Sequence, residues 1–264
     1  MKRLHILYTL LFIWLLPVTS NGQPAGKEKL RVISYNIWNG FEHDASRRAN
    51  FINWIKGQQP DILAMTELVG FTEKDLGQLA SEYGHKYYAI VKEEGYPVGI
   101  TSNEPITVVK KQMEGFWHGM LHVKTHGLDM IVTHLSPHDW KFRLKEAQML
   151  TSYIQDNQLD NCMVMGDFNA YSPFDADWVE THAQLIENMQ KWDAEQEAYR
   201  NMRDGRFDYS VLSKFLSIGL TDICRLYVPA DKRTTFPAAF LYGWQHGDTR
   251  LHGIGERLDY ILVS

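Results

Sequence analysis

The sequence predicts an α+β fold in which β-sheets pack together and helices cover them on the outside. Segments with the apolar pattern of strands are interspersed with segments of helical periodicity. Two successive strand segments around His126-Gly127 predict a hairpin, which argues against a purely parallel wound sheet. The chain has 264 residues, 44% of them hydrophobic, and shows no repeat or linker. We therefore expect one domain over residues 23–264.

The first half of the chain alternates strands and helices. Residues 31–37 and 62–67 are apolar and predict two strands. Between them, Asp44 can cap a helix that runs to about residue 58 and stops before Pro60. Thr72-Glu73-Lys74-Asp75 resembles a capping box, and the helix that it opens should end at Gly84. Further strands are expected at residues 87–91 and 107–109.

The second half begins with the hairpin, over residues 120–124 and 128–133. Asp139 is a candidate N-cap for a helix over residues 141–157, and residues 162–166 form the next strand. Residues 174–217 are mainly helical and amphipathic, with an interruption near Asp204-Gly205. A last strand is expected at residues 258–263.

The N-terminus has the pattern of a secretory signal peptide. Lys2 and Arg3 precede a short apolar stretch, and small residues follow Pro17. The stretch is too short for a permanent transmembrane helix, and no cysteine follows it to carry a lipid anchor. We expect residues 1–22 to be removed, which predicts a secreted or periplasmic protein with no stable membrane span.

Charge and cysteine content limit the partners. Loss of Lys2 and Arg3 with the leader leaves 25 of the 27 basic residues against 32 acidic ones, a net charge of −7. Such a balance does not predict a strongly basic nucleic-acid face. Cys162 and Cys224 are expected to be small buried thiols, although an oxidising compartment would permit a disulfide.

Polar side chains stand at the ends of five predicted strands, where each follows or interrupts an apolar run. They are Asn36, Glu67, His134, the pair Asp167 and Asn169, and Asp259. A single polar residue at a strand end is usually a turn residue, but five strands that each supply one predict a common site. Two carboxylates about 4 Å apart repel by ~4 kcal/mol at an effective dielectric constant near 20, so a cluster needs a cation, a shared proton or a basic partner. Oxygen ligands favour a hard cation such as Mg²⁺ or Mn²⁺.

Five motifs around these residues resemble, in order, those of the endonuclease/exonuclease/phosphatase superfamily. They are Ser34-Tyr35-Asn36-Ile37-Trp38, Asp61-Ile62-Leu63-Ala64-Met65-Thr66-Glu67, Thr133-His134-Leu135, Gly166-Asp167-Phe168-Asn169 and Arg257-Leu258-Asp259-Tyr260-Ile261. The resemblance runs from about residue 31 to residue 264. It implies a four-layer α/β/β/α sandwich of two packed mixed sheets with outer helices, and a site at one edge of both sheets.

The resemblance also implies a role for each residue. Glu67 would hold the metal ion, with Asn36 as a direct or water-mediated ligand. His134 would hydrogen-bond the scissile phosphate, and Asp167 would orient or deprotonate the attacking water. Asn169 would position the phosphate or the water.

The resemblance also implies that Asp259 would orient a histidine. The family places this histidine in a Ser-Asp-His motif on a further strand. The sequence stops at Ser264 without that motif. We expect a truncated sequence, because a core strand at the end of the chain would leave a sheet edge unpaired. A chain that lacks the histidine and its strand should be a poor catalyst.

The expected function is divalent-metal-dependent hydrolysis of phosphate esters by a monomer, as a phosphodiesterase or phosphatase. Small or lipid-linked esters are expected rather than DNA, because of the acidic balance. An extracellular nuclease is one alternative. A non-catalytic protein that binds phosphate ligands on the same scaffold is another. The loops over residues 170–217 and 228–255 should decide the substrate.

Other candidate residues have a simpler structural interpretation. His118, His122 and His126 recur every four residues, but they fall on strands and are expected at the surface. Arg257 is expected on the outer face of its strand, although it and Arg250 could contact phosphate. Four aromatic residues near the motifs could border a cleft, but each is expected to serve packing. They are Trp38, Trp140, Tyr171 and Trp244.

Overall fold

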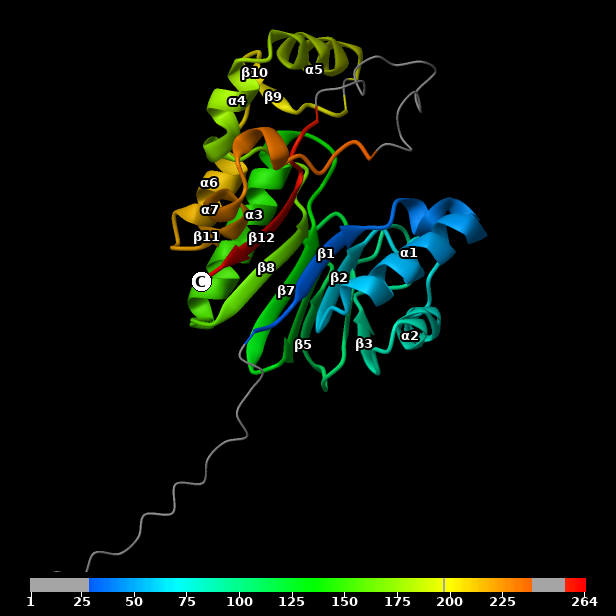
Figure 1. Cartoon of the computed structure of the whole chain (residues 1–264). Helices are drawn as coiled ribbons and strands as arrows, with labels where there is room; N and C mark the ends of the chain where they lie inside the picture. The colour runs from blue at the N-terminus through cyan, green and yellow to red at the C-terminus, as the bar shows by residue number, and fades with distance from the viewer. Residues whose placement is uncertain (1–28, 197, 239–254) are drawn as a thin grey trace, which may run out of the picture.

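The computed structural model describes residues 29–196, 198–238 and 255–264, and contains two mixed β-sheets (Figure 1). The first sheet has four strands, in the order β1 (Val32–Asn36), β2 (Ile62–Thr66), β4 (Gly99–Ser102) and β3 (Tyr87–Ile90). The second has six, in the order β11 (Thr221–Asp222), β12 (Asp259–Val263), β8 (Cys162–Asp167), β7 (Leu128–His134), β6 (Met120–Thr125) and β5 (Thr107–Gln112). In each sheet one pair is parallel, β1 with β2 and β7 with β8, and the other pairs are antiparallel.

Helices cover the outer face of each sheet, which confirms the predicted four-layer sandwich. The four-stranded sheet carries α1 (Ala45–Gln58) and α2 (Glu73–Glu82). The six-stranded sheet carries α3 (Trp140–Asp156) and α6 (Ser210–Leu216). At one end of the sandwich lie α4 (Ala176–Glu180), α5 (Ala183–Glu195) and the short hairpin of β9 (Met202–Arg203) and β10 (Arg206–Phe207) (Figure 1). The shorter elements are η1 (Asn39–His43), η2 (Pro173–Asp175), α7 (Ile223–Tyr227) and η3 (Ala230–Lys232).

Strand β2 shows how the sequence supplies both sides of a sheet. All five of its residues are buried. Because side chains alternate between the faces of a strand, Leu63 and Met65 pack under α1 and α2, while Ile62 and Ala64 pack between the sheets. An uninterrupted apolar run is therefore what this strand requires.

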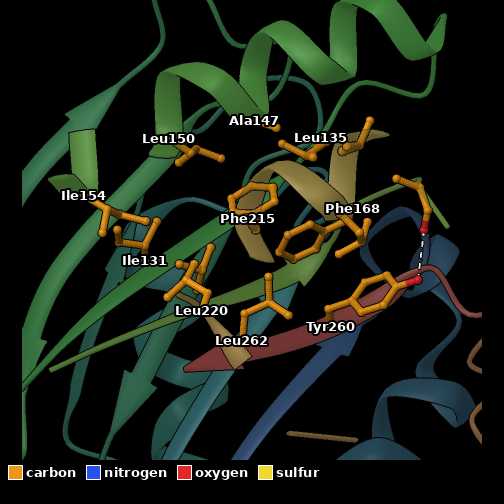
Figure 2. Packing of buried hydrophobic residues seen from close by; sticks show 14 of the residues in the cluster. Ile131, Leu135, Ala147, Leu150, Ile154, Phe168, Phe215, Leu220, Tyr260 and Leu262 are labelled. Atoms are coloured by element: carbon orange, nitrogen blue, oxygen red, sulfur yellow. Dashed lines mark hydrogen bonds between the residues drawn. The ribbon is translucent and has the colours of Figure 1, made fainter. Parts of the chain in front are cut away.

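Aliphatic side chains and three aromatic rings fill the layer between α3, α6 and the six-stranded sheet (Figure 2). Phe168 lies at its centre, with ring centroids 5.1 Å from Phe215 and 5.4 Å from Tyr260, both in edge contact. The Tyr260 hydroxyl donates to the carbonyl of Ala170 at 3.1 Å, so the buried phenol leaves no polar group unpaired. This layer holds the strand that carries Asp167 and Asn169.

The helix caps follow the sequence prediction. Asp44 accepts hydrogen bonds from two backbone N–H groups of the first turn of α1, and Asp139 accepts from Phe142 N at 2.9 Å. Thr72 and Asp75 form the predicted capping box. The predicted interruption at Asp204-Gly205 is the turn of the β9–β10 hairpin, where both residues have positive φ.

Three features differ from the prediction. Strand β4 was not expected, because its sequence Gly-Ile-Thr-Ser lacks a strong apolar signal, yet all four residues are buried in the sheet. Strand β12 has a neighbour that was not expected, because β11 pairs with Leu262 and Val263, while the rest of β12 pairs with β8 alone in the described sheet. Arg257 is buried rather than exposed, in ion pairs with Asp175 and Asp222.

Both cysteines are free, with Cys162 buried and Cys224 partly exposed. No helix in the described part of the chain is long and apolar enough to cross a bilayer. The segment predicted as a signal peptide lies outside the described residues.

Truncation of Phe215 to alanine should lower the free energy of unfolding by about 3–5 kcal/mol, because it leaves a cavity beneath α6. Urea denaturation followed by circular dichroism measures the change. Tyr227→Ala is the control, since that ring is 83% exposed and its removal should change little. Equal stability of the two variants would contradict the packing described for this layer.

Candidate active site

Strand register brings the predicted site residues to one end of the sandwich. Asn36 ends β1, and Glu67 follows the end of the parallel neighbour β2. His134 and Asp167 end the parallel strands β7 and β8 and stand opposite each other. Asp259 begins the antiparallel strand β12 and stands opposite Asp167 on its other side. The two sheets meet at this end, so all six residues line one cleft, with Asn169 two residues after Asp167.

Asn36 connects the two sheets. Its Nδ2 donates to Glu67 Oε1 at 2.9 Å and to Asp167 Oδ2 at 3.1 Å. Its Oδ1 accepts from the backbone N of Trp38 at 2.8 Å, which fixes the orientation of the carboxamide. The second oxygen of Glu67 accepts from Asn39 N at 2.8 Å. One carboxamide thus bridges carboxylates from both sheets and reduces their mutual repulsion.

The end of β8 and the loop that follows it have an unusual backbone conformation. Gly166 has φ +135°, and a Cβ atom there would lie 1.9 Å from the carbonyl oxygen of Thr133, so only glycine fits. Asn169 has φ 46°, a left-handed value that asparagine tolerates. Its backbone N donates to Asp167 Oδ1 at 2.9 Å, and its Nδ2 donates to the carbonyl of Leu135 at 2.9 Å. These contacts direct both side chains into the cleft.

His134 is a neutral, buried imidazole. Burial lowers its pKa to about 3. Its Nε2 lies 3.1 Å from Asn169 Nδ2 and 3.8 Å from Asp167 Oδ2, and because the ring is neutral the second contact is not an ion pair at neutral pH. The other ring nitrogen, Nδ1, is buried and has no hydrogen-bond partner among the described residues.

The carboxylates of the site are poorly solvated. Burial raises the pKa of Asp167 to about 6, against a usual value of 3.8. Burial is also the main cause of the raised pKa of Glu67, opposed by its hydrogen bond from Asn36. Burial and then the charge of Asp167 raise the pKa of Asp259, whose Oδ1 has no partner in the described part of the chain. Raised carboxyl pKa values at one point are typical of a functional site.

The residues present fit a hard divalent cation. Ligand atoms of Glu67, His134 and Asp167 all lie within 4.8 Å of one another, and all three residues are buried. Asn36 and Asp259 add a carboxamide and an unpartnered carboxylate oxygen beside them. A cation would supply the positive charge that the desolvated carboxylates lack.

The cleft has a volume of about 890 Å³ and a distinct composition. Four carboxylates line it, those of Glu67, Asp167, Asp259 and Glu256. No lysine or arginine is among its described lining residues. Aromatic and amide side chains form much of the remaining lining, and they come from α5 and from the loops that follow β1, β3, β5, β7, β8 and α5. These residues include Trp38, Tyr96, Trp117, His138, Tyr171, Asn188, Trp192, Tyr199 and Asn201.

The prediction that the three evenly spaced histidines lie at the surface is wrong. His118 is buried in the cleft and stacks on His134, with ring centroids 4.2 Å apart and planes 23° apart. His122 is a core residue, hydrogen-bonded to Tyr153 and Asp129. The side chain of His126 is also largely shielded and contacts Asn103. Spacing along a strand reports which face a residue occupies, but not which layer covers that face.

The remaining candidates divide between the cleft and the core. Trp38 and Tyr171 line the cleft, whereas Trp140 lies outside it beneath Arg203. Asp139 caps α3 as predicted, and the loop that precedes it also supplies Pro137 and His138 to the cleft. Trp244 and Arg250 lie outside the described residues.

Comparison with known proteins agrees with this architecture. The profile of the Endonuclease/Exonuclease/phosphatase family matches residues 33–264. An AP endonuclease from Archaeoglobus fulgidus is similar in structure, with a TM-score of 0.60, 20% identity, and coverage of 89% of this chain and 86% of that chain. The 3′ phosphatase NExo from Neisseria, solved with product DNA hairpin, has a TM-score of 0.62, 19% identity, and coverage of 89% and 87%. A 3′-5′ exonuclease structure from Neisseria meningitidis has a TM-score of 0.59, 19% identity, and coverage of 83% and 82%. Among curated proteins, none matches the sequence.

The raised carboxyl pKa values predict a pH-dependent stability. A carboxyl group whose folded-state pKa is raised stabilises the protein below its unfolded pKa, and this contribution is lost as the pH rises through the folded pKa. For Asp167 this window extends from about 3.8 to about 6. In excess chelator, Asp167→Asn should therefore raise the melting temperature relative to the wild type, and more so at pH 7.5 than at pH 5. The buried histidines have lowered pKa values, so their contribution to stability has the opposite pH dependence. Both proteins contain these histidines, so the contribution cancels when the variant is compared with the wild type. Calorimetry on both proteins measures it, and a stabilisation that is absent or independent of pH would contradict the burial of this carboxylate.

Proposed function

This chain belongs to the endonuclease/exonuclease/phosphatase family, and from that premise we propose that it is a divalent-metal-dependent hydrolase of phosphate esters. The observation that carries the proposal is that Glu67, His134 and Asp167 come from both sheets and meet inside a large cleft. One ligand atom of each lies within 4.8 Å of those of the other two. Glu67 would hold Mg²⁺ or Mn²⁺, with Asn36 as a supporting ligand. A bound cation would neutralise charge on the phosphoryl oxygens.

Asp167 is the proposed general base for the attacking water. Burial raises its pKa to about 6 in the metal-free protein, so this carboxylate has a higher affinity for a proton than a solvated aspartate has. The hydrogen bonds from Asn36 and Asn169 hold both carboxylate oxygens in place. In the part of the chain that the structure describes, no serine, cysteine or threonine is hydrogen-bonded to an imidazole ring of the cleft. Direct attack by water is accordingly favoured over a covalent intermediate.

His134 and Asn169 are proposed to bind the phosphate. A neutral imidazole carries one N–H group, which can donate to a phosphoryl oxygen as negative charge develops. Asn169 Nδ2 donates to the imidazole Nε2, so the N–H group of the neutral ring is at Nδ1, which has no partner among the described residues. Asp259 adds a third carboxylate to those of Glu67 and Asp167. Its Oδ1, which has no partner among the described residues, is available to accept from a proton donor or from a ligand of the cation.

Small or lipid-linked esters are the proposed substrates. Duplex DNA carries one negative charge per ~1.7 Å, and proteins that bind it use lysine and arginine on the backbone phosphates. The described lining of this cleft has neither, and the chain carries 32 acidic against 27 basic residues. The nuclease alternative has support from solved relatives that act on DNA. The presence of Asn36, Glu67, Asp167 and Asn169 in the cleft argues against a non-catalytic binding protein, whereas the missing Ser-Asp-His histidine argues for it. The signal-peptide pattern supports secretion or export to the periplasm.

Asp167→Asn should lower kcat by about 10²–10⁴-fold on bis-p-nitrophenyl phosphate with Mg²⁺, because the variant cannot accept the proton of water. Initial rates measure the effect, and Glu67→Gln should instead raise the concentration of Mg²⁺ that gives half-maximal rate. Excess chelator should stop turnover by the wild type. Full activity of Asp167→Asn, or of the wild type in chelator, would refute the mechanism.

Supercoiled plasmid should be nicked at least tenfold less efficiently than bis-p-nitrophenyl phosphate is hydrolysed, as measured by kcat/KM under matched conditions. The reason is that the described lining of the cleft has no lysine or arginine to contact the flanking phosphates. Sphingomyelin, inositol phosphates and p-nitrophenyl phosphate complete the comparison. Efficient nicking with no turnover of the other esters would favour the nuclease alternative.

A further inference from the structure

Three aromatic rings from separate loops form one side of the cleft. Trp117 precedes β6, His138 follows β7, and Tyr199 follows α5. The centroids of Trp117 and His138 are 4.1 Å apart, and those of His138 and Tyr199 are 5.0 Å apart with planes 24° from parallel. Trp117 remains 48% exposed and Tyr199 37% exposed. We refer to these three residues as the aromatic wall.

Two buried charged residues of α3 hold the loops that carry the wall. Glu146, with no exposed surface, accepts from Trp117 N and from Ser136 N, both at 2.8 Å. Arg143, 1% exposed, donates to the carbonyl of His138 and to Asn201 Oδ1 at 2.9 Å. Each of the three aromatic loops is thus attached to the same helix by a charge-assisted hydrogen bond.

This anchoring indicates a binding surface rather than incidental exposure. Taking a carboxylate and a guanidinium out of water is costly unless they are hydrogen-bonded, and here their partners are backbone and amide groups of the cleft loops. Of the Arg143 guanidinium, only Nε has no partner among the described residues. Loops fixed in this way lose little conformational freedom when a ligand binds, so exposed rings on them can contribute directly to affinity.

The chemistry of the wall selects among ligands. A second phosphate is disfavoured, because no lysine or arginine is among the described lining residues of the cleft. A quaternary ammonium group is best bound by rings that surround it, whereas these three rings stand in a row and contact each other. A row of ring surfaces beside the amides of Asn188 and Asn201 suits an uncharged ring with polar edges.

We propose that the aromatic wall is a subsite for an uncharged ring, a nucleobase or a sugar, that the substrate carries next to its scissile phosphate. This proposal rests on the proposed function for the identity of the phosphate site. It assigns to Trp117 and Tyr199 a role in substrate selection. Neither residue takes part in metal binding or in proton transfer. Arg143 and Glu146 are then positioning residues for the wall.

Binding of small phosphate monoesters tests the proposal without requiring turnover. Titration calorimetry with Mg²⁺, in the Asp167→Asn background so that no probe is consumed, compares thymidine 5′-monophosphate, glucose 6-phosphate, phosphocholine and methyl phosphate. Trp117→Ala and Tyr199→Ala should each weaken binding of at least one ring-bearing probe by about tenfold, the usual loss when a stacking ring is removed. Methyl phosphate and phosphocholine should bind as before, and Trp117→Phe should retain most of the affinity.

Tyr227→Ala provides the matched control, because it removes an aromatic ring that is 83% exposed and outside the cleft lining. Loss for thymidine monophosphate alone identifies a nucleobase, and loss for glucose 6-phosphate identifies a sugar ring. Equal loss for methyl phosphate would overturn the proposal in favour of a structural role for the wall. Loss confined to phosphocholine, or no loss for any probe, would overturn it as well.

Turnover of methyl p-nitrophenyl phosphate by the wild type, with Mg²⁺, separates this proposal from the proposed function. Turnover without ring-selective binding would leave the hydrolase in place and reject the wall as a subsite. Ring-selective binding without turnover of any ester would leave the wall in place and reject the hydrolase.

Discussion

The site is organised by the confinement of three carboxylates at the end where the two sheets meet. Glu67 comes from one sheet, and Asp167 and Asp259 from neighbouring strands of the other. Like charges so close together in a poorly solvated place oppose folding unless something compensates them. Asn36 supplies part of the compensation by donating to Glu67 and Asp167 at once. The part that is not compensated raises the pKa values of Glu67, Asp167 and Asp259. A bound divalent cation would lower these pKa values again.

The packing behind the site keeps these groups in register. Phe168, between Asp167 and Asn169, points to the opposite side and is fully buried against Phe215 and Tyr260. Arg257 fixes the start of β12 through a two-point ion pair with Asp222 and a further one with Asp175. A guanidinium so deeply paired belongs to the scaffold, and its removal would leave the buried carboxylate of Asp222 without an ion pair, while Asp175 would keep Arg233.

The cleft combines a strongly acidic end with an aromatic side. Helix α3 serves both, since its apolar face covers the six-stranded sheet and its buried charges hold the loops at the opening of the cleft. A cation at the acidic end would attract one phosphate, while the wall offers contacts to the rest of a ligand. The division assigns charge recognition and shape recognition to different residues.

Local patterns in the sequence determined the elements and the chemistry of the site. Strand ends, helix caps and the ordered motifs depend on residues within a few positions of one another, so the six site residues and most helices and strands could be predicted. Strand β4 could not, because its burial comes from neighbours on both sides of the sheet rather than from its own composition. The surroundings of His118 and Arg257 also required the tertiary structure. His118 stacks on His134, and Arg257 pairs with Asp175 and Asp222. All of these partners lie far away in the sequence, so no local pattern reveals them. The aromatic wall also required the tertiary structure. Its three loops are far apart in the sequence and are brought together by hydrogen bonds to Arg143 and Glu146 of α3.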